Sequence, residues 1–301
     1  MARTSLTPLH AALALLTIAI WGTNFVVIKL ALAHLPPLTF AALRFTFAAL
    51  PAVLFFKRPK VPLWSLATYG VLIGVGQFGL LYIAMRGMIS PGLASLVVQT
   101  QAFFTIGFAM AFAGERLRGF QLAALALATA GLGWMMAHAG AEVTPLGVAL
   151  VLGAALSWGA GNTVQRAVRP DNMLGFVVWS SLFAIPPLFA LAIGIDGWPA
   201  VSSGVTHATV GTWAAVAYQA VGNTLIGYGA WGWLLSRYPA AVISPLSLLV
   251  PVFGMAASSA FLGEPLSDWK LVAAGLVLGG LALNTLWPMW TRRRAAVAPS
   301  S

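Results

Sequence analysis

The chain repeats part of itself at a fixed spacing, and this repetition restricts the available folds more than any other feature. A Gly-Glu-Arg-Leu turn at 114–117 and a Gly-Glu-Pro-Leu turn at 263–266 are each followed by an apolar run rich in small residues, and the copies are 149 positions apart. An earlier pair, Trp21-Gly22 and Trp158-Gly159, is 137 positions apart. The difference places an insertion of 12 residues in the second copy, most simply the polar stretch 196–207. The pattern predicts two homologous halves.

The composition excludes an ordinary water-soluble domain. The chain is 60% hydrophobic and 7% charged, and its mean hydropathy is +0.90, whereas a soluble domain has about 25% charged residues. Its net charge is +10, but the basic residues form no patch interleaved with aromatics, so we expect no nucleic-acid partner. Cysteine is absent, which excludes disulfides and thiolate metal sites. We therefore expect lipid as the surrounding solvent.

Ten apolar runs are long enough to cross a bilayer, which needs about 20 helical residues. The first run is too long for the core of a signal peptide, so we expect it to be retained as a span. The ten predicted spans are 10–32, 38–56, 64–85, 90–112, 118–137, 145–166, 173–194, 209–235, 239–261 and 269–290.

The basic residues predict the orientation of these spans. Twelve of the 16 fall on the side of the N-terminus, whereas only Arg86 and Lys270 fall on the other side. By the positive-inside rule both termini are cytoplasmic, which suits a multi-pass protein of a bacterial inner membrane. The Glu115 loop is then inside and the Glu264 loop outside. Two halves, 10–137 and 145–290, each with an odd number of spans, would lie inverted relative to each other. Inverted repeats are a recurring design of transporters.

Two motifs also carry a family resemblance. The Trp-Gly-Thr-Asn opening at 21–24 and the Gly-Glu-x-Leu turn in each half, together with five spans per half, resemble the EamA branch of the drug/metabolite transporter superfamily. The run 99–104 and the Trp-rich spans are most similar to its aromatic amino acid exporters, the YddG type. The resemblance implies an all-α membrane protein with ten helices in two inverted five-helix repeats. It also implies a central cavity lined mainly by spans 1, 3, 4, 6, 8 and 9, and export of small metabolites. The second half departs from the first at Asn162, one position away from the equivalent of Asn24.

Polar and aromatic side chains within the spans are the candidate substrate-binding residues. Amides and phenols can hydrogen-bond the ammonium and carboxylate of a zwitterion, and flat aromatic walls suit an apolar side chain. The alternative is that each polar group only joins two helices, at about 0.6 kcal/mol. Their concentration on spans 1, 3, 4, 6 and 8 favours a cavity. The candidates are Asn24, Gln77, Tyr82, Gln99, Trp158, Asn162, Tyr218, Gln219 and Asn223.

Arg44 is a charged residue that lies well inside a predicted span. It lies about six residues from the outer end of span 2, hence roughly 9 Å deep. We expect it to snorkel toward the outer headgroups. The alternative is that it places a charge in the cavity or meets the carboxylate of the substrate.

The acids and histidines bear on energy coupling. All six acids and four histidines fall in predicted loops or at span edges, whereas proton-coupled carriers commonly use such a group inside the membrane. The sequence therefore favours facilitated efflux over strict proton antiport, with a span-edge acid such as Glu115 as the alternative proton carrier. Pro245 and Pro251 predict a kink in span 9 that span 4 lacks.

These observations predict a secondary transporter that exports amino acids, aromatic and other neutral ones, by alternating access. We expect no enzymatic activity, cofactor or metal. The expected partners are a small zwitterionic substrate and membrane lipid, and a monomer would suffice. The alternatives are a multidrug or cation exporter, which would want a buried acid, and a membrane-embedded enzyme, which would need acids, histidines or a metal cluster at bilayer depth. A channel or scaffold is less favoured by the duplication.

Overall fold

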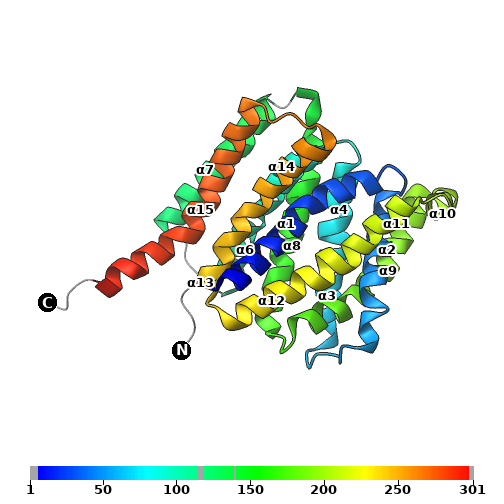
Figure 1. Ribbon diagram of the computed structural model, residues 1–301, viewed down its shortest axis with the longest axis horizontal. Coiled ribbons are helices and arrows are strands. Elements are labelled where there is room, and N and C mark those ends of the chain that lie inside the picture. Colours follow the sequence, from blue (N-terminus) through cyan, green and yellow to red (C-terminus); the bar gives the residue numbers. More distant parts are fainter. Residues whose placement is uncertain (1–5, 114–117, 139, 298–301) are drawn as a thin grey trace.

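The protein is an all-helical bundle (Figure 1). The computed structural model describes residues 6–113, 118–138 and 140–297. The predicted cytoplasmic loop around Glu115 lies outside these ranges. Helices occupy every predicted span, and apart from the end of the last helix their bounds agree with the prediction to within two residues.

The helical runs that correspond to the predicted spans are, in chain order, α1 (Pro8–Ala31); α2 with η1 (Pro37–Ala49, Ala52–Leu54); α3, η2 and α4 (Leu63–Val71, Leu72–Gly79, Leu80–Met85); α5, η3 and α6 (Pro91–Val97, Val98–Thr100, Gln101–Ala113); α7 (Gly119–His138); α8 (Pro145–Val168); α9 (Met173–Asp196); α11, η5 and α12 (Val210–Ala217, Tyr218–Ile226, Gly227–Arg237); α13, η6 and α14 (Ala240–Ile243, Ser244–Leu249, Val250–Leu262); and α15 (Asp268–Val297).

By length and apolar character, nine helices within the described ranges could cross a membrane. The run 210–237 is as long as the others but is not among the nine. It carries Tyr218, Gln219 and Asn223, which lower its apolar character. The predicted span with too little apolar character is thus the one with the most candidate site residues.

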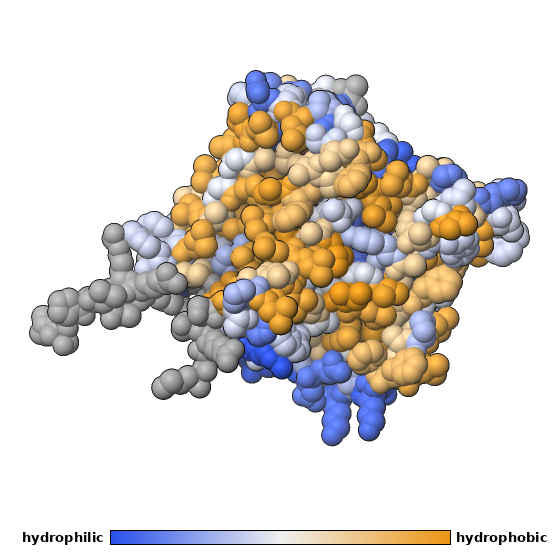
Figure 2. All heavy atoms as spheres, viewed as in Figure 1, coloured by the Kyte–Doolittle hydropathy of each residue, from blue (hydrophilic) through white to orange (hydrophobic). Residues whose placement is uncertain are grey.

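Apolar side chains cover the middle of the molecule. Figure 2 shows them over most of one face, with hydrophilic residues gathered at its upper and lower ends. Large hydrophobic residues such as Leu54, Phe112 and Phe261 are more than 70% exposed. A surface of this kind is stable only in lipid, so the structure is that of a multi-pass membrane protein.

Equivalent helices begin in the same way. Thr7 and Thr144, 137 positions apart, each precede a proline and accept a hydrogen bond from the backbone N–H three residues later, at 3.3 Å and 3.0 Å. Proline fits the first turn of a helix because its missing N–H would have no partner there. The threonine caps one of the free amides. Local sequence therefore fixes the start of the first helix in each half.

The Trp-Gly motif is explained by close helix packing. A Cβ on Gly22 of α1 would lie 2.4 Å from the Cβ of Phe253 in α14. A Cβ on Gly159 of α8 would lie 2.9 Å from the Cβ of Phe104 in α6. Phe104 and Phe253 are themselves 149 positions apart. The same contact is therefore made twice, between span 1 and span 9 and between span 6 and span 4.

The pair α7 and α15 packs side by side along one edge of the bundle (Figure 1), and its contacts are also reciprocal. A Cβ on Gly131 would meet Val277, and a Cβ on Gly280 would meet Ala128. Gly131 matches Gly280, and Ala128 matches Val277, at the 149 spacing. Small residues allow two helices to approach closely in lipid, so each helix presents its glycine to the other.

Breaks in regular helix geometry also recur. Spans 3 and 8 each contain a π-helical segment, η2 and η5, and spans 4 and 9 each contain a 3₁₀ segment, η3 and η6. The segments η6 in span 9 and η3 in span 4 both depart from regular α-helix geometry, so the prolines of span 9 do not distinguish the two spans in this respect. In η3 the Thr100 hydroxyl donates to the carbonyl of Val97 at 2.8 Å, a back-bond that competes with regular helix geometry without any proline.

The insertion, which lies between two predicted spans, forms a helix. Gly197, at φ 82°, ends α9, and α10 (Trp198–Thr206) follows with Pro199 in its first turn. Only the single glycine between them is irregular. The sequence combines a residue that readily adopts positive φ with a proline at a helix start, which favours two helices over a loop.

We expect Gly22→Ala to lower the free energy of unfolding by about 1–3 kcal/mol, because the added methyl group overlaps Phe253. Thermal unfolding of the purified protein in detergent would measure this. Gly107→Ala is the matched control, since a Cβ at Gly107 of α6 meets no atom within 4 Å. Equal stability of the two variants would contradict the close packing of α1 and α14.

Candidate functional site

Three of the predicted residues meet in one buried amide cluster. Asn24 lies on α1, and Gln219 and Asn223 lie on η5; all three are at most 4% exposed. The Gln219 amide nitrogen donates to the Asn24 side-chain oxygen. The Asn223 amide donates to the Gln219 side-chain oxygen at 3.3 Å. Because Gln219 and Asn223 are four residues apart, they share one helix face, as the sequence predicts.

The π segment η5 shapes this cluster. The Thr224 hydroxyl donates to the carbonyl of Gln219, five residues earlier, at 2.9 Å. The indole N–H of Trp21 donates to the backbone carbonyl of Asn223 at 3.2 Å. Wide helical turns leave carbonyls that must find other donors. Here Trp21 supplies such a donor, which gives the tryptophan of the Trp-Gly motif a structural role that sequence analysis missed.

Tyr218 lies next to Gln219 in sequence, and its hydroxyl also contacts α1. Its hydroxyl donates to the carbonyl of Ile20 at 2.8 Å and lies 2.8 Å from the hydroxyl of Thr23. In this conformation the phenol joins two helices, which is the alternative role considered above.

Asn162 takes part in a separate cluster. Its amide donates to the side-chain oxygen of Gln101 at 3.0 Å and to the Thr105 hydroxyl at 3.3 Å, both on α6. Asn24 faces span 8, whereas Asn162 faces span 4. The one-position departure from the repeat explains this, because one residue turns a side chain by about 100° around a helix. The two asparagines are therefore not equivalent in the structure.

The remaining candidates are dispersed. Gln77 in η2 is 3% exposed, and its side-chain oxygen has no hydrogen-bond partner among the described residues. Gln99 is buried in η3, and Trp158 is half-buried against the hydrophobic core. The structure therefore does not bring all nine predicted residues into one site.

Arg44 does not snorkel, so that expectation is wrong. It is 1% exposed and is held inside the bundle by neutral groups. One guanidinium nitrogen donates to the Tyr82 hydroxyl at 3.1 Å and the other to the Thr224 hydroxyl at 3.1 Å. The guanidinium carbon lies 3.5 Å from the centre of the Phe78 ring. These partners on spans 3 and 8 could not be identified from the sequence of span 2.

A small cavity adjoins Arg44. Its volume is about 10 Å³, and residues of α2, α3, η2, α9, η5 and α12 line it. That volume holds the centre of roughly one water molecule. Spans 2 and 7 thus contribute to the space around the charge, whereas the resemblance implied lining mainly by spans 1, 3, 4, 6, 8 and 9.

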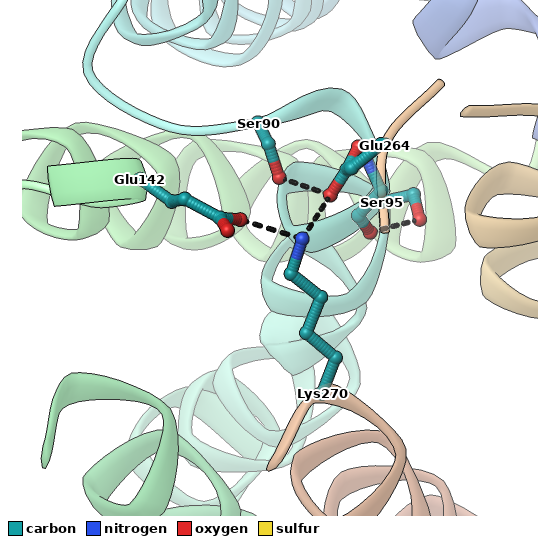
Figure 3. A network of polar contacts seen from close by, with 6 residues as sticks. Ser90, Ser95, Glu142, Glu264 and Lys270 are labelled. Carbon is teal, nitrogen blue, oxygen red and sulfur yellow. Dashed lines mark hydrogen bonds and ion pairs between the residues drawn. The ribbon is translucent and has the colours of Figure 1, made fainter. Parts of the chain in front are cut away.

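A buried ionic network at the end of the bundle was also missed by sequence analysis (Figure 3). Lys270 on α15 is fully buried and lies 3.1 Å from the Glu264 carboxylate and 2.5 Å from that of Glu142. Glu264 also accepts the Ser90 hydroxyl at 2.5 Å and the backbone N–H of Gly92 at 3.1 Å. The glutamate of the second Gly-Glu-x-Leu turn therefore ties the last two spans to the start of α5. Lys270, which the count of basic residues placed on the outer side, is thus buried in this network.

The described carboxylates lie at the ends of the bundle. They are in loops, in short connecting helices or at helix termini. Within the described ranges, no three His, Asp or Glu side chains are grouped to hold a metal ion.

We expect Lys270→Met to destabilise the protein by up to about 3–5 kcal/mol, since it leaves the largely buried carboxylate of Glu264 without its cation. Arg86→Met is the control. It breaks the Arg86–Asp196 pair, in which the arginine side chain is 60% exposed, so we expect a loss below about 1 kcal/mol. Chemical or thermal unfolding in detergent would compare them. Similar losses in both variants would show that the network adds little beyond a surface ion pair.

Comparison with known proteins identifies the family. The model of the EamA-like transporter family matches residues 9–137 and 145–286. The chain belongs to this family. It is therefore a transporter rather than an enzyme, and its substrate is a small molecule.

Curated relatives match over nearly their full length. A "probable amino-acid metabolite efflux pump" of Escherichia coli (strain K12) is 41% identical over 286 residues, covering 93% of this chain and 96% of the relative. A protein with the same description from Salmonella typhimurium is 41% identical, covering 95% and 97%. An "uncharacterized inner membrane transporter" of Escherichia coli, YedA, is 27% identical, covering 98% and 96%.

The fold also matches a solved structure. A crystal structure with no more specific description superposes with a TM-score of 0.63 at 19% identity, covering 95% of this chain and 99% of the other. At that identity the likeness concerns the fold alone.

Proposed function

We propose that this protein exports amino-acid-like metabolites from the cytoplasm by alternating access. The buried amide cluster of Asn24, Gln219 and Asn223 is the observation that carries the proposal. Its oxygens can accept from an ammonium group and its amide hydrogens can donate to a carboxylate. Two relatives that match almost the whole chain are described as efflux pumps for amino-acid metabolites, which agrees with this chemistry.

The transport cycle would use two inverted halves, 10–137 and 145–290. Reciprocal packing supports this arrangement: Gly22 meets Phe253 as Gly159 meets Phe104, and α7 meets α15 through equivalent residues. A substrate site at the interface of such halves opens to one side and then the other as the halves rock. The amide cluster joins α1 of the first half to η5 of the second, so it spans the interface that must move.

We further propose a bacterial inner-membrane location with both termini cytoplasmic. The start of α1 and the end of α15 lie toward the same side of the bundle (Figure 1). The loop that follows η1 carries Lys57, Arg58 and Lys60, as expected for a cytoplasmic loop. In this orientation the Lys270 network lies at the outer end.

Export of cations or hydrophobic drugs is less well supported. A buried carboxylate would be the natural partner of a cationic substrate. The described carboxylates lie at the ends of the bundle, whereas the cation Arg44 is buried among the spans. The same distribution favours facilitated efflux, because an exchangeable proton carrier is not found among the described residues inside the spans.

The proposal is tested by uptake of radiolabelled L-serine, L-leucine and L-phenylalanine into liposomes that contain the purified protein, with and without a pH gradient. A cationic dye such as ethidium provides the rival substrate. We expect transport of at least one amino acid without a gradient. Transport of the dye alone would contradict the proposal.

We expect Gln219→Ala to lower that transport about tenfold, as loss of roughly 1.4 kcal/mol of hydrogen bonding would do. The variant should still insert, because insertion depends on the apolar runs rather than on one amide. Gln121→Ala is the control: Gln121 lies on α7, at the edge of the bundle, and its side chain accepts from the backbone of Arg118. Unchanged transport by Gln219→Ala would remove this residue from the site.

A further inference from the structure

We infer that Arg44 binds the carboxylate of the transported substrate. This inference rests on the proposed function and adds a chemical class: substrates with a free carboxylate, in preference to their amides and esters. It concerns a residue outside the amide cluster, on a different span.

The first argument is the missing counter-charge. Arg44 is 1% exposed in the middle of a membrane protein. Arg44 has no ion-pair partner among the described residues, whereas Arg86 pairs with Asp196 and Lys270 pairs with Glu142 and Glu264. A charge at bilayer depth is costly and is found where function requires it. The positive charge of Arg44 is therefore available to an anion from outside the chain.

The second argument is the incomplete set of hydrogen bonds. Tyr82 and Thr224 each accept one bond from the guanidinium, and Phe78 covers one face of it. The Nε of Arg44 has no partner among the described residues. A guanidinium is donor-only, with a fork that matches the two oxygens of a carboxylate. The group that completes this arrangement must therefore be an acceptor, and an anionic one fits best.

The third argument is the cavity next to Arg44. Ser180 and Ser181 of α9 line it together with Tyr69, Thr224 and Tyr228. The Ser180 hydroxyl is buried without a partner among the described residues. A second unpartnered donor thus lies on the wall of the same cavity. Hydroxyl groups and a guanidinium around one space form a binding site for carboxylate oxygens.

The position of this cavity fits a zwitterion. The Thr224 hydroxyl accepts from Arg44 and donates to the carbonyl of Gln219. It therefore connects the arginine to the amide cluster, whose side-chain oxygens can accept from an ammonium group. A substrate with both charges would place its carboxylate toward Arg44 and its ammonium toward Asn24 and Gln219.

A cavity of about 10 Å³ is too small for a carboxylate group, so binding requires this space to widen. Arg44 on α2 and Ser181 on α9 are 137 positions apart, so they are equivalent residues of the two halves, and α2 packs against α9. A relative movement of the halves would therefore widen the space between them. At these equivalent positions the first half supplies a positive charge and the second half supplies a hydroxyl group. The site is therefore not symmetric, although the two halves are related by a repeat.

The experiment compares wild type, Arg44→Gln, and Lys29→Gln in lipid nanodiscs and liposomes. Lys29→Gln is the matched control, since it also removes one positive charge, but from the last turn of α1 rather than from the interior of the bundle. Thermal unfolding is measured with L-serine, L-leucine and L-phenylalanine and with the primary amide of each. Transport of the three labelled amino acids is measured in parallel, with the amides as competitors.

We expect the amino acids to stabilise and to compete at least about tenfold better than their amides in wild type and in Lys29→Gln. A tenfold difference in affinity corresponds to the free energy contributed by about one charge-assisted hydrogen bond. In Arg44→Gln this preference should disappear. A protein that transports amino acids but accepts the amides equally well would overturn the inference and leave the proposed function intact. A preference that persists in Arg44→Gln would do the same.

Failure of the proposed function, with the carboxylate site intact, would give a different set of results. Stabilisation by the acids but not by the amides, lost in Arg44→Gln, with no transport of any of the three, would support the carboxylate site and contradict amino acid export. If Arg44→Gln does not fold, the wild-type comparison of acid with amide decides the matter, because equal effects of the two are incompatible with a carboxylate site. Tyr82→Phe, which removes one acceptor that holds Arg44, then serves as the second variant and should weaken acid binding more than amide binding.

Discussion

A polar side chain inside a bilayer finds no water, so its hydrogen bonds must be made within the protein. The centre of this bundle is organised by that constraint. Gln219 reaches across to Asn24, Trp21 donates to a carbonyl of η5, and Arg44 is held between Tyr82 and Thr224. Each of these bonds joins different spans. The groups that could hold a substrate are therefore the same groups that hold the helices together. A substrate that binds to them would have to replace these interhelical hydrogen bonds with hydrogen bonds of its own.

The outer packing follows a simpler rule. Lipid offers no hydrophobic gain for bringing two helices together, so close approach and van der Waals contact decide the association. Gly22 and Gly159 permit it against equivalent phenylalanines, and Gly131 and Gly280 permit it between α7 and α15. These contacts explain why the Trp-Gly pair and the small-residue runs after each Gly-Glu-x-Leu turn stand out in the sequence. Their repetition in the sequence corresponds to close helix contacts that occur twice in the structure.

The sequence allowed the positions of the spans to be predicted to within about two residues at most ends, because apolar runs and their Pro, Gly and charge boundaries are local features. The pairing of Gln219 with Asn223 on one face was likewise local. The environments of Arg44 and Lys270 could not be predicted, since their partners come from spans distant in sequence. The same holds for Asn162, whose orientation depends on a one-residue shift within α8. The π segments left no local signal, although their recurrence at equivalent positions follows from the repeat.

The polar character of the run 210–237 has a consequence for how the protein is made. Every other predicted span is apolar enough to cross a membrane by that measure, so each can partition from the translocon into lipid without help. The run that contains η5 has a weaker tendency to do so. The amide of Gln219 and the carbonyl of Asn223 find their partners on α1, which leaves the ribosome long before. The run 210–237 therefore depends, for the partners of its polar groups, on a helix that can enter the lipid before it.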